Sequence, residues 1–388
     1  MISDTASLDA RGEETVSELL AWRPAHGVLS VYLRLDPGQR SPNWPTEVHN
    51  GLSATLSAGR EGMDHEARQA LEATAKRLER DLHADEEPPA EAAGLIGFVE
   101  VAGKPAEERW YAVQIPPRRT EVLHAPVPAV HQLLELFDDG APMGVAVVSS
   151  ERVRLLDWRL GRMEQLHDWE LEYFAGDWRE RKSQRPRDPA HGEAVSAAGR
   201  DQYNQRLEAT RERFAHQTGE LARTEAWKGG WRETLAFGDE RYVRQFARGL
   251  GAAFGLRHVD AGDLISESIA QTERRVAEMV PGLNRQRERS LIERIKEAAY
   301  AEGRSSLGIQ ETLQALQEGR VEHLVYDAGR EYPDAPLTST GESGQDGLPL
   351  IERMIEYAFS TGAAITPVEN ESARLLDEQD GVASLLRY

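Results

Sequence analysis

The sequence predicts an α/β protein of three domains, which we expect at residues 1–140, 141–280 and 281–388. Two observations support this organisation. The chain has 388 residues, which is more than one hydrophobic core usually organises. Along it, segments with the period of a β-strand alternate with segments that have the period of an α-helix.

The first domain is expected to combine strands with two helices. Residues 28–35, "VLSVYLRL", alternate apolar residues in one register and precede a Pro/Gly loop, which indicates a strand. Helical spacing of apolar residues follows at residues 48–56 and at residues 71–82. The stretches "GLIGFVEVAG" and "ERWYAVQIPP" are expected to pair as strands, and "APVPAVHQLLELFDDGAP" to form a connecting helix.

The second domain is expected to begin with a meander of three strands, "MGVAVVSSERVRLLDWRLGRMEQLHDWEL". A basic segment and a helix from about Gly199 to Arg223 follow. Then come a strand "WRETLAFG", a helix "RYVRQFARGLGAAF", a strand "LRHVD", and a helix "DLISESIAQTERRVAEMV" that we expect Pro281 to end. The order β-β-β-α-β-α-β-α is that of RNase H-like domains.

The third domain is predicted to be a compact α/β domain. Helical spacing resumes near Leu291, and a further helix from Ile309 is expected to stop at Gly319. A strand at residues 321–326, a helix around 348–359, a strand "AAITPV" and the terminal "DGVASLLRY" complete it. Between them, "YPDAPLTSTGESGQDG" is polar and rich in turn residues, so we expect a long mobile loop.

Composition excludes several classes of protein. There is no cysteine, which rules out disulfides, thiolate metal sites and thiol nucleophiles. No apolar run approaches the ~20 residues that cross a bilayer, and the N-terminus lacks the basic start and apolar core of a secretory signal. We therefore expect a cytoplasmic protein. A formal net charge of −20 also argues against a protein that coats nucleic acid with its whole surface.

Catalytic and metal motifs are missing from the sequence. The eleven histidines form no HExxH pair, and neither GxSxG nor GxxxxGK[ST] occurs. "GLGAAFG" places Phe254 where a dinucleotide loop needs its third glycine, so we interpret it as a helix end. An RNase H-like nuclease would need a carboxylate on its first strand, whereas Glu151 and Asp157 lie beyond that strand. We expect no catalytic residue, no metal and no cofactor.

The segment "WRERKSQRPR" at residues 178–187 concentrates positive charge in this acidic chain. We place it in a basic loop at residues 176–198, followed by an arginine-rich helix. Several cations on such a loop can neutralise RNA phosphates, although composition alone allows a solvated polar loop equally well. The candidate RNA-binding residues are Arg179, Arg181, Lys182, Arg185, Arg187, His191, Gly192, Arg200, Arg206 and Arg211.

The order of strand meander, basic loop, His191-Gly192 and arginine-rich helix resembles the archaeo-eukaryotic class-1 release factor and Pelota superfamily, in particular its bacterial branch. The resemblance covers the second and third domains, where "LGIQETLQALQEGRVEHLVYDAG" and "DGVASLLRY" are also similar to the family. It implies that the third domain is a compact α/β/α sandwich of the release-factor type. In this family the basic loop carries His-Gly-x-Gly-Gly-Gln and enters the peptidyl-transferase centre.

The Gly-Gly-Gln signature of that family is absent. If His191-Gly192 aligns with the family's His-Gly, the three positions fall on Ala194, Val195 and Ser196. Paired glycines allow backbone conformations that are closed to Val195, and Ser196 is too short to project an amide as glutamine does. We therefore expect no hydrolysis of peptidyl-tRNA by the family's route, while RNA binding through the cations is unaffected.

The resemblance implies a ribosome-binding translation factor that enters the A site with its basic loop toward the peptidyl-transferase centre. It would act in ribosome rescue, stress response or hibernation without terminating translation. The implied partners are ribosomal RNA, tRNA and a translational GTPase of the elongation-factor class, with neither membrane nor DNA. Two alternatives stay open: a peptidyl-tRNA hydrolase in which His191 or Gln184 positions water, and a protein-interaction module with no ribosome contact.

Overall fold

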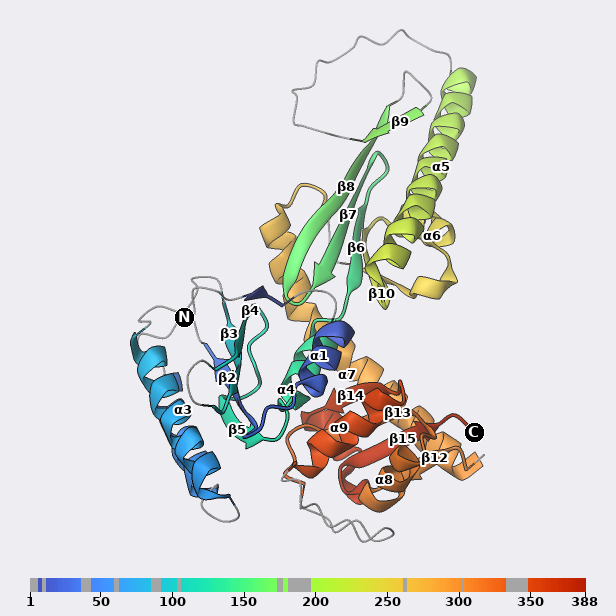
Figure 1. Ribbon diagram of the computed structural model, residues 1–388. Helices are drawn as coiled ribbons and strands as arrows, with labels where there is room; N and C mark the ends of the chain where they lie inside the picture. Colours follow the sequence, from blue (N-terminus) through green and yellow to red (C-terminus); the bar gives the residue numbers. More distant parts are fainter. Residues whose placement is uncertain are drawn as a thin grey trace. The chain divides into compact units, whose positions relative to one another are not determined.

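The computed structural model describes residues 6–8, 12–35, 43–58, 63–84, 92–102, 106–172, 177–180, 197–260, 264–301, 303–332 and 348–388. These residues form three separate sheets with helices packed on them, which confirms the predicted α/β class (Figure 1). The chain divides into two compact units. The central unit is Gly140–Met279, and the flanking unit combines Met1–Asp139 with Val280–Tyr388. The three-domain boundaries stay a prediction.

The first sheet lies in the flanking unit and has the strand order β1-β4-β3-β2-β5. Its strands are β1 (Ala6–Ser7), β2 (Val28–Arg34), β3 (Gly94–Glu100), β4 (Glu108–Val113) and β5 (Glu121–Ala125). Its helices are α1 (Gly12–Ala21), α2 (Trp44–Ala58), α3 (His65–Ala84) and α4 (His131–Asp139). Leu29, Val31 and Leu33 of β2 pack with apolar residues of α2 and α3, which is why both helices show the predicted apolar spacing.

Sequence patterns missed three elements of this part: β1, α1 and β5. Strand β5 pairs antiparallel with β2 from Val28 to Tyr32, so β2 lies inside the sheet, between β3 and β5. Its five residues lie between proline-rich stretches, and the neighbouring prolines made the whole region look like a connection. The expected helix at its end is present as α4.

The central sheet has the order β11-β10-β6-β7-β8-β9. Its strands are β6 (Met143–Val148), β7 (Arg152–Arg159), β8 (Arg162–Glu172), β9 (Asp177–Glu180), β10 (Glu233–Gly238) and β11 (Leu256–Val259). Strands β6 to β9 form an antiparallel meander, and β10 runs parallel to both β6 and β11. With α5 (Ala197–Gly229), α6 (Glu240–Leu250) and the 3₁₀ turn η2 (Ala252–Phe254), this is the predicted RNase H-like arrangement.

The beginning of the predicted basic loop is a strand. Residues 177–180 form β9, in which Trp178 pairs with Leu171 of the long strand β8. The loop expected at residues 176–198 is therefore shorter at this end than its charge and proline content suggested. Residues 181–196 lie outside the described part of the chain.

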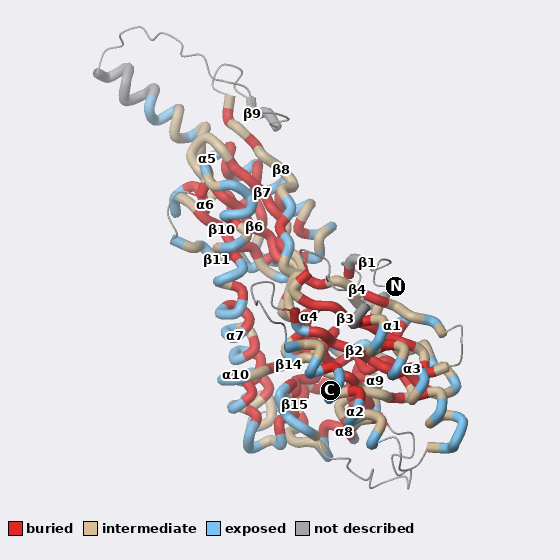
Figure 2. Tube along the Cα trace, turned by 90° about the vertical axis from the view of Figure 1, so that its left-hand side faces the viewer, coloured by how far each residue is buried: buried red, intermediate tan, exposed pale blue. Residues whose placement is uncertain are grey.

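Helix α7 (Ile269–Ala301) continues through Pro281, so the prediction that Pro281 ends a helix is wrong. A proline inside a helix removes one backbone hydrogen bond, and tertiary packing can compensate for that loss. Here Val276, Val280 and Leu283 are buried on either side of the proline. Figure 2 shows the resulting alternation of buried and exposed positions along α7.

The third sheet has the order β12-β15-β13-β14 and also belongs to the flanking unit. Its strands are β12 (Ser305–Leu307), β13 (Val321–Asp327), β14 (Ala364–Val368) and β15 (Val382–Leu386). The helices are α8 (Ile309–Gln317), α9 (Leu350–Ser360) and α10 (Asn370–Arg374), with a 3₁₀ turn η3 (Asp377–Gln379). Leu291, Ile292 and Ile295 of α7 cover one face, while α8 and α9 lie on the other, as predicted for a sandwich (Figure 1).

Two further expectations concern loops and membranes. Most of the loop expected after the third domain's first strand, residues 333–347, lies outside the described residues. Within the described ranges, no helix is both long and apolar enough to cross a membrane.

Candidate nucleic-acid interface

The predicted RNA-binding residues fall into three groups. Six lie outside the described ranges: Arg181, Lys182, Arg185, Arg187, His191 and Gly192. For Arg179 and Arg200 the structure describes only the backbone, which places them on β9 and in the first turn of α5. Arg206 and Arg211 lie further along α5 and are fully described. In the central unit, β9 and the beginning of α5 lie at the same end (Figure 1).

Arg206 and Arg211 differ in what their side chains do. Arg206 is exposed. The guanidinium of Arg211 contacts Glu208 at 2.6 Å and Glu151, in the turn after β6, at 2.8 Å. Arg211 therefore ties α5 to the sheet, and it could bind a phosphate only by giving up these ion pairs.

Glu208 connects α5 to α6. Its carboxylate accepts a hydrogen bond from the hydroxyl of Tyr242 at 3.0 Å and contacts Arg241 at 2.8 Å. Hydrogen bonds from Arg211 and Tyr242 lower the pKa of Glu208, so the carboxylate is charged at neutral pH. Arg241 also contacts Glu212 at 2.8 Å. These pairs fix the beginning of α6 against the middle of α5.

Asp157, the carboxylate considered for metal binding, is engaged in packing. It accepts hydrogen bonds from Arg159 at 3.1 Å and from the indole nitrogen of Trp231. The ring of Trp231 lies over Gly144 of β6, where a Cβ would come within 2.3 Å of the ring. Among the described residues, no cluster of three metal-ligating side chains occurs.

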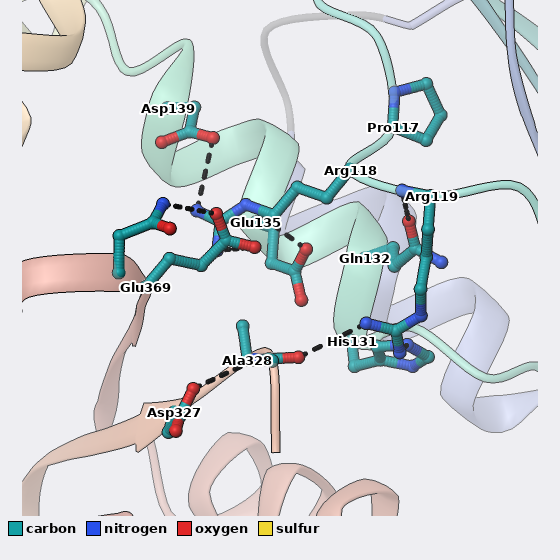
Figure 3. A network of polar contacts seen from close by, with 12 residues as sticks. Pro117, Arg118, Arg119, His131, Gln132, Glu135, Asp139, Asp327, Ala328 and Glu369 are labelled. Atoms are coloured by element: carbon teal, nitrogen blue, oxygen red, sulfur yellow. Dashed lines mark hydrogen bonds and ion pairs between the residues drawn. The ribbon is translucent and has the colours of Figure 1, made fainter. Parts of the chain in front are cut away.

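A second concentration of titratable groups lies in the flanking unit, around His131 at the beginning of α4 (Figure 3). Nδ1 of His131 lies 2.6 Å from Glu352 of α9, and Nε2 lies 2.9 Å from Glu121 of β5. Glu352 also accepts hydrogen bonds from the backbone N–H groups of Val130 and His131. A carboxylate from the third sheet's helix thus caps α4, where the helix dipole favours negative charge. We name His131, Glu121 and Glu352 the His131 cluster.

The His131 cluster holds a buried positive charge. Burial alone would lower the pKa of His131, but hydrogen bonds to Glu121 and Glu352 outweigh it and raise the pKa to about 10. Burial would likewise raise the pKa of Glu121, yet the hydrogen bond from His131 and its charge lower it to about 2. The imidazolium is therefore paired on both nitrogens.

Arg118 forms a neighbouring cluster with three carboxylates. Its guanidinium contacts Glu369 at 3.0 Å, Asp139 at 3.3 Å and Glu135 at 3.4 Å, as Figure 3 shows. Glu135 is buried, and in the described structure its oxygens accept no hydrogen bond. Burial raises the pKa of Glu135 to about 7, although Arg118 opposes this. Sequence analysis found neither cluster, because their members lie up to 251 positions apart.

Comparison with known families decides the relationship of the central part of the chain. Residues 128–285 match the family described as bacterial archaeo-eukaryotic release factor family 10. This part of the chain is similar to the bacterial branch of the release-factor superfamily. The matched range contains the whole RNase H-like unit, with the basic segment and α5 inside it. The resemblance inferred from the sequence is confirmed.

Several solved structures align with most of the chain. An archaeal translation termination factor aligns over 100% of both chains with 19% identity and a TM-score of 0.27. Pelota from Archaeoglobus fulgidus covers 76% of this chain and 79% of its own, with 14% identity and a TM-score of 0.32. A ribosome-bound archaeal Pelota covers 76% and 78%, with 13% identity and a TM-score of 0.40. At these TM-scores the alignments add no weight, and no curated protein matches the sequence.

Proposed function

We propose that the protein is a ribosome-binding factor that enters the A site with the basic segment of its release-factor domain directed toward the peptidyl-transferase centre. The observation that carries this proposal is the concentration of cations at residues 178–187, in front of α5, in a chain of net charge −20. RNA phosphates attract such a segment, whereas the acidic remainder of the chain limits indiscriminate binding.

The architecture of the central unit suits this role. Helix α5 has 33 residues and so a length of about 50 Å. Its second half packs on the sheet and on α6, with Phe214, Ala215, Ala222 and Ala226 in the core. Strand β9 and the beginning of α5, which flank the basic segment in the sequence, lie at the opposite end of α5 from this packing (Figure 1).

The proposed role is rescue, stress response or hibernation, without hydrolysis of peptidyl-tRNA by the family's route. Ala194, Val195 and Ser196 stand where that route requires Gly-Gly-Gln. The partners that we propose are ribosomal RNA and tRNA, together with a translational GTPase of the elongation-factor class. Their basis is the family relationship of residues 128–285.

Co-sedimentation with purified ribosomes at increasing salt tests the proposal. One variant replaces Arg179, Arg181, Lys182, Arg185 and Arg187 by alanine. A matched variant makes the same charge change on exposed arginines elsewhere, at Arg80, Arg274, Arg285, Arg289 and Arg294. We expect the first variant to bind more weakly and to lose about one unit of salt slope per phosphate contact removed, while the matched variant binds like the natural protein.

Two outcomes would contradict the proposal. If the natural protein does not sediment with ribosomes from growing, starved or cold-treated cells, the ribosomal role falls and a protein-interaction module becomes the better account. If both five-residue variants bind equally well, the basic segment is not the anchor.

A further inference from the structure

An exposed tryptophan marks the end of α5 that lies away from the basic segment. Trp227 is 70% exposed, and it is the one exposed tryptophan among those whose side chains the structure describes. Its ring meets Phe254 of η2 edge to face, with centroids 5.1 Å apart and planes at 84°. Phe254 is itself buried at 5% exposure. The Trp227 ring thus packs against Phe254 on one side, and most of the indole faces solvent.

The support beneath Trp227 is closely packed. Helices α5 and α6 run side by side in the same direction. Contacts from Arg241, Phe246 and Gly251 reach Glu208, Gly219 and Arg223 in turn, so residue numbers increase together along both helices. Both helices use glycine at the contact. A Cβ on Gly219 would lie 2.2 Å from the carbonyl oxygen of Phe246, and one on Gly249 would lie 2.0 Å from that of His216. The backbone that carries Trp227 is therefore held in place by the contact between the two helices.

The surroundings of Trp227 favour an anionic ligand. Arg223 lies one helical turn before Trp227, on the same face of α5, and its side chain passes Gly251. Arg248 is exposed in the last turn of α6 and donates a hydrogen bond to Gln245. Among the described residues, neither of these arginines makes an ion pair. The other three arginines of residues 241–259, Arg241, Arg244 and Arg257, pair with glutamates.

We propose that Trp227 is a stacking platform for a base of single-stranded RNA, with Arg223 and Arg248 as contacts for the adjacent phosphates. An aromatic ring beside arginines is the combination that single-stranded RNA binders use, since every base offers a π-face and every linkage a charge. The inference rests on the proposed function and adds a second RNA contact at the other end of α5. An apolar peptide would use the tryptophan but would leave the two arginines without a partner.

The test is binding of a fluorescent single-stranded oligoribonucleotide of about eight residues, followed by anisotropy. It is carried out in the variant that lacks the five cations of the basic segment, so that this segment does not contribute. Adding Trp227→Ala should weaken binding by about 5- to 150-fold, the equivalent of about 1–3 kcal/mol for one stacked base. Trp227→Phe should retain part of the affinity. Arg223→Gln and Arg248→Gln should each lower the salt dependence by about one unit.

Tyr300→Ala is the matched control, because Tyr300 is 89% exposed and belongs to the flanking unit. This variant should bind RNA unchanged, and all variants should unfold at the temperature of the parent protein. An RNA affinity that Trp227→Ala does not alter would overturn the inference. If this variant binds RNA normally but binds ribosomes more weakly, the inference also fails, because Trp227 would then contact a protein. If RNA binding depends on Trp227 while the natural protein ignores ribosomes, the stacking site stands and the proposed function falls.

Discussion

Single residues decide how the first and third sheets are joined, and His131 is the central one. Its imidazolium lies between Glu121 and Glu352, and all three side chains are largely excluded from solvent. Removing one member of a buried ion pair leaves an uncompensated charge, which costs more than the pair itself contributes. The sequence does not predict this cluster, because Glu352 lies 221 positions from His131. The cationic segment, by contrast, is visible in ten consecutive residues.

His131→Gln should destabilise the protein by about 3–5 kcal/mol at pH 6 in urea unfolding, since it removes a buried charge from between two carboxylates. The folded-state pKa of about 10 lies above the ordinary value of 6.5. The stability from protonated His131 is therefore complete below pH 6.5 and is lost as pH rises through about 10. The difference between the natural protein and the variant should shrink steadily over this range. A difference that does not change with pH would show that His131 is neutral.

Glu135→Gln should have the opposite sign. Burial raises the pKa of Glu135 from 4.5 to about 7, so protonation stabilises the folded state. That contribution is complete below pH 4.5 and disappears as pH rises through about 7. The variant should match the natural protein at pH 4.5 and exceed it by up to about 3 kcal/mol at pH 8. A loss of stability at pH 8 would mean that charged Glu135 stabilises Arg118 by more than its burial costs.

At the scale of elements, periodicity predicted most of the long helices and strands because each has one buried stripe or a buried run. The failures have separate physical causes. Strand β5 is five residues long and lies among prolines, and β9 is four residues long in a cationic stretch. Helix α7 passes through Pro281 because apolar packing on both sides outweighs one lost hydrogen bond. Local sequence patterns contain little information about short edge strands and about tertiary packing.

The α5–α6 contact gives a prediction of its own. Gly219→Ala or Gly249→Ala should destabilise the central unit by at least about 1–3 kcal/mol, because the added Cβ meets backbone oxygens that cannot move freely. Gly282→Ala in α7 is the matched control, since its Cβ would approach only the far end of Arg285, at 4.0 Å. That change should be neutral or stabilise the helix by about 1 kcal/mol. Chemical unfolding of the three variants measures this, and equal effects at all three sites would refute the close contact.

At the scale of the whole molecule, charge and family relationship lead to the same account. The chain is strongly acidic, and the cations that could meet RNA are gathered in residues 128–285, which match a release-factor family. The missing Gly-Gly-Gln separates binding from hydrolysis in this account. Sequence alone was sufficient for the superfamily, because the order of elements around the basic segment can be read from local patterns, and for the missing signature, because it concerns consecutive residues. The exposed Trp227 and its two arginines required the structure, because they come from two helices.

Release of labelled peptide from programmed ribosomes tests the central claim most directly. The natural protein is added at concentrations at which co-sedimentation shows the ribosomes to be occupied, and released peptide is counted. The account predicts that the protein binds the ribosomes and that peptide is released no faster than from ribosomes without the protein. Robust release by the natural sequence would contradict it and would make the protein a peptidyl-tRNA hydrolase with a non-standard loop.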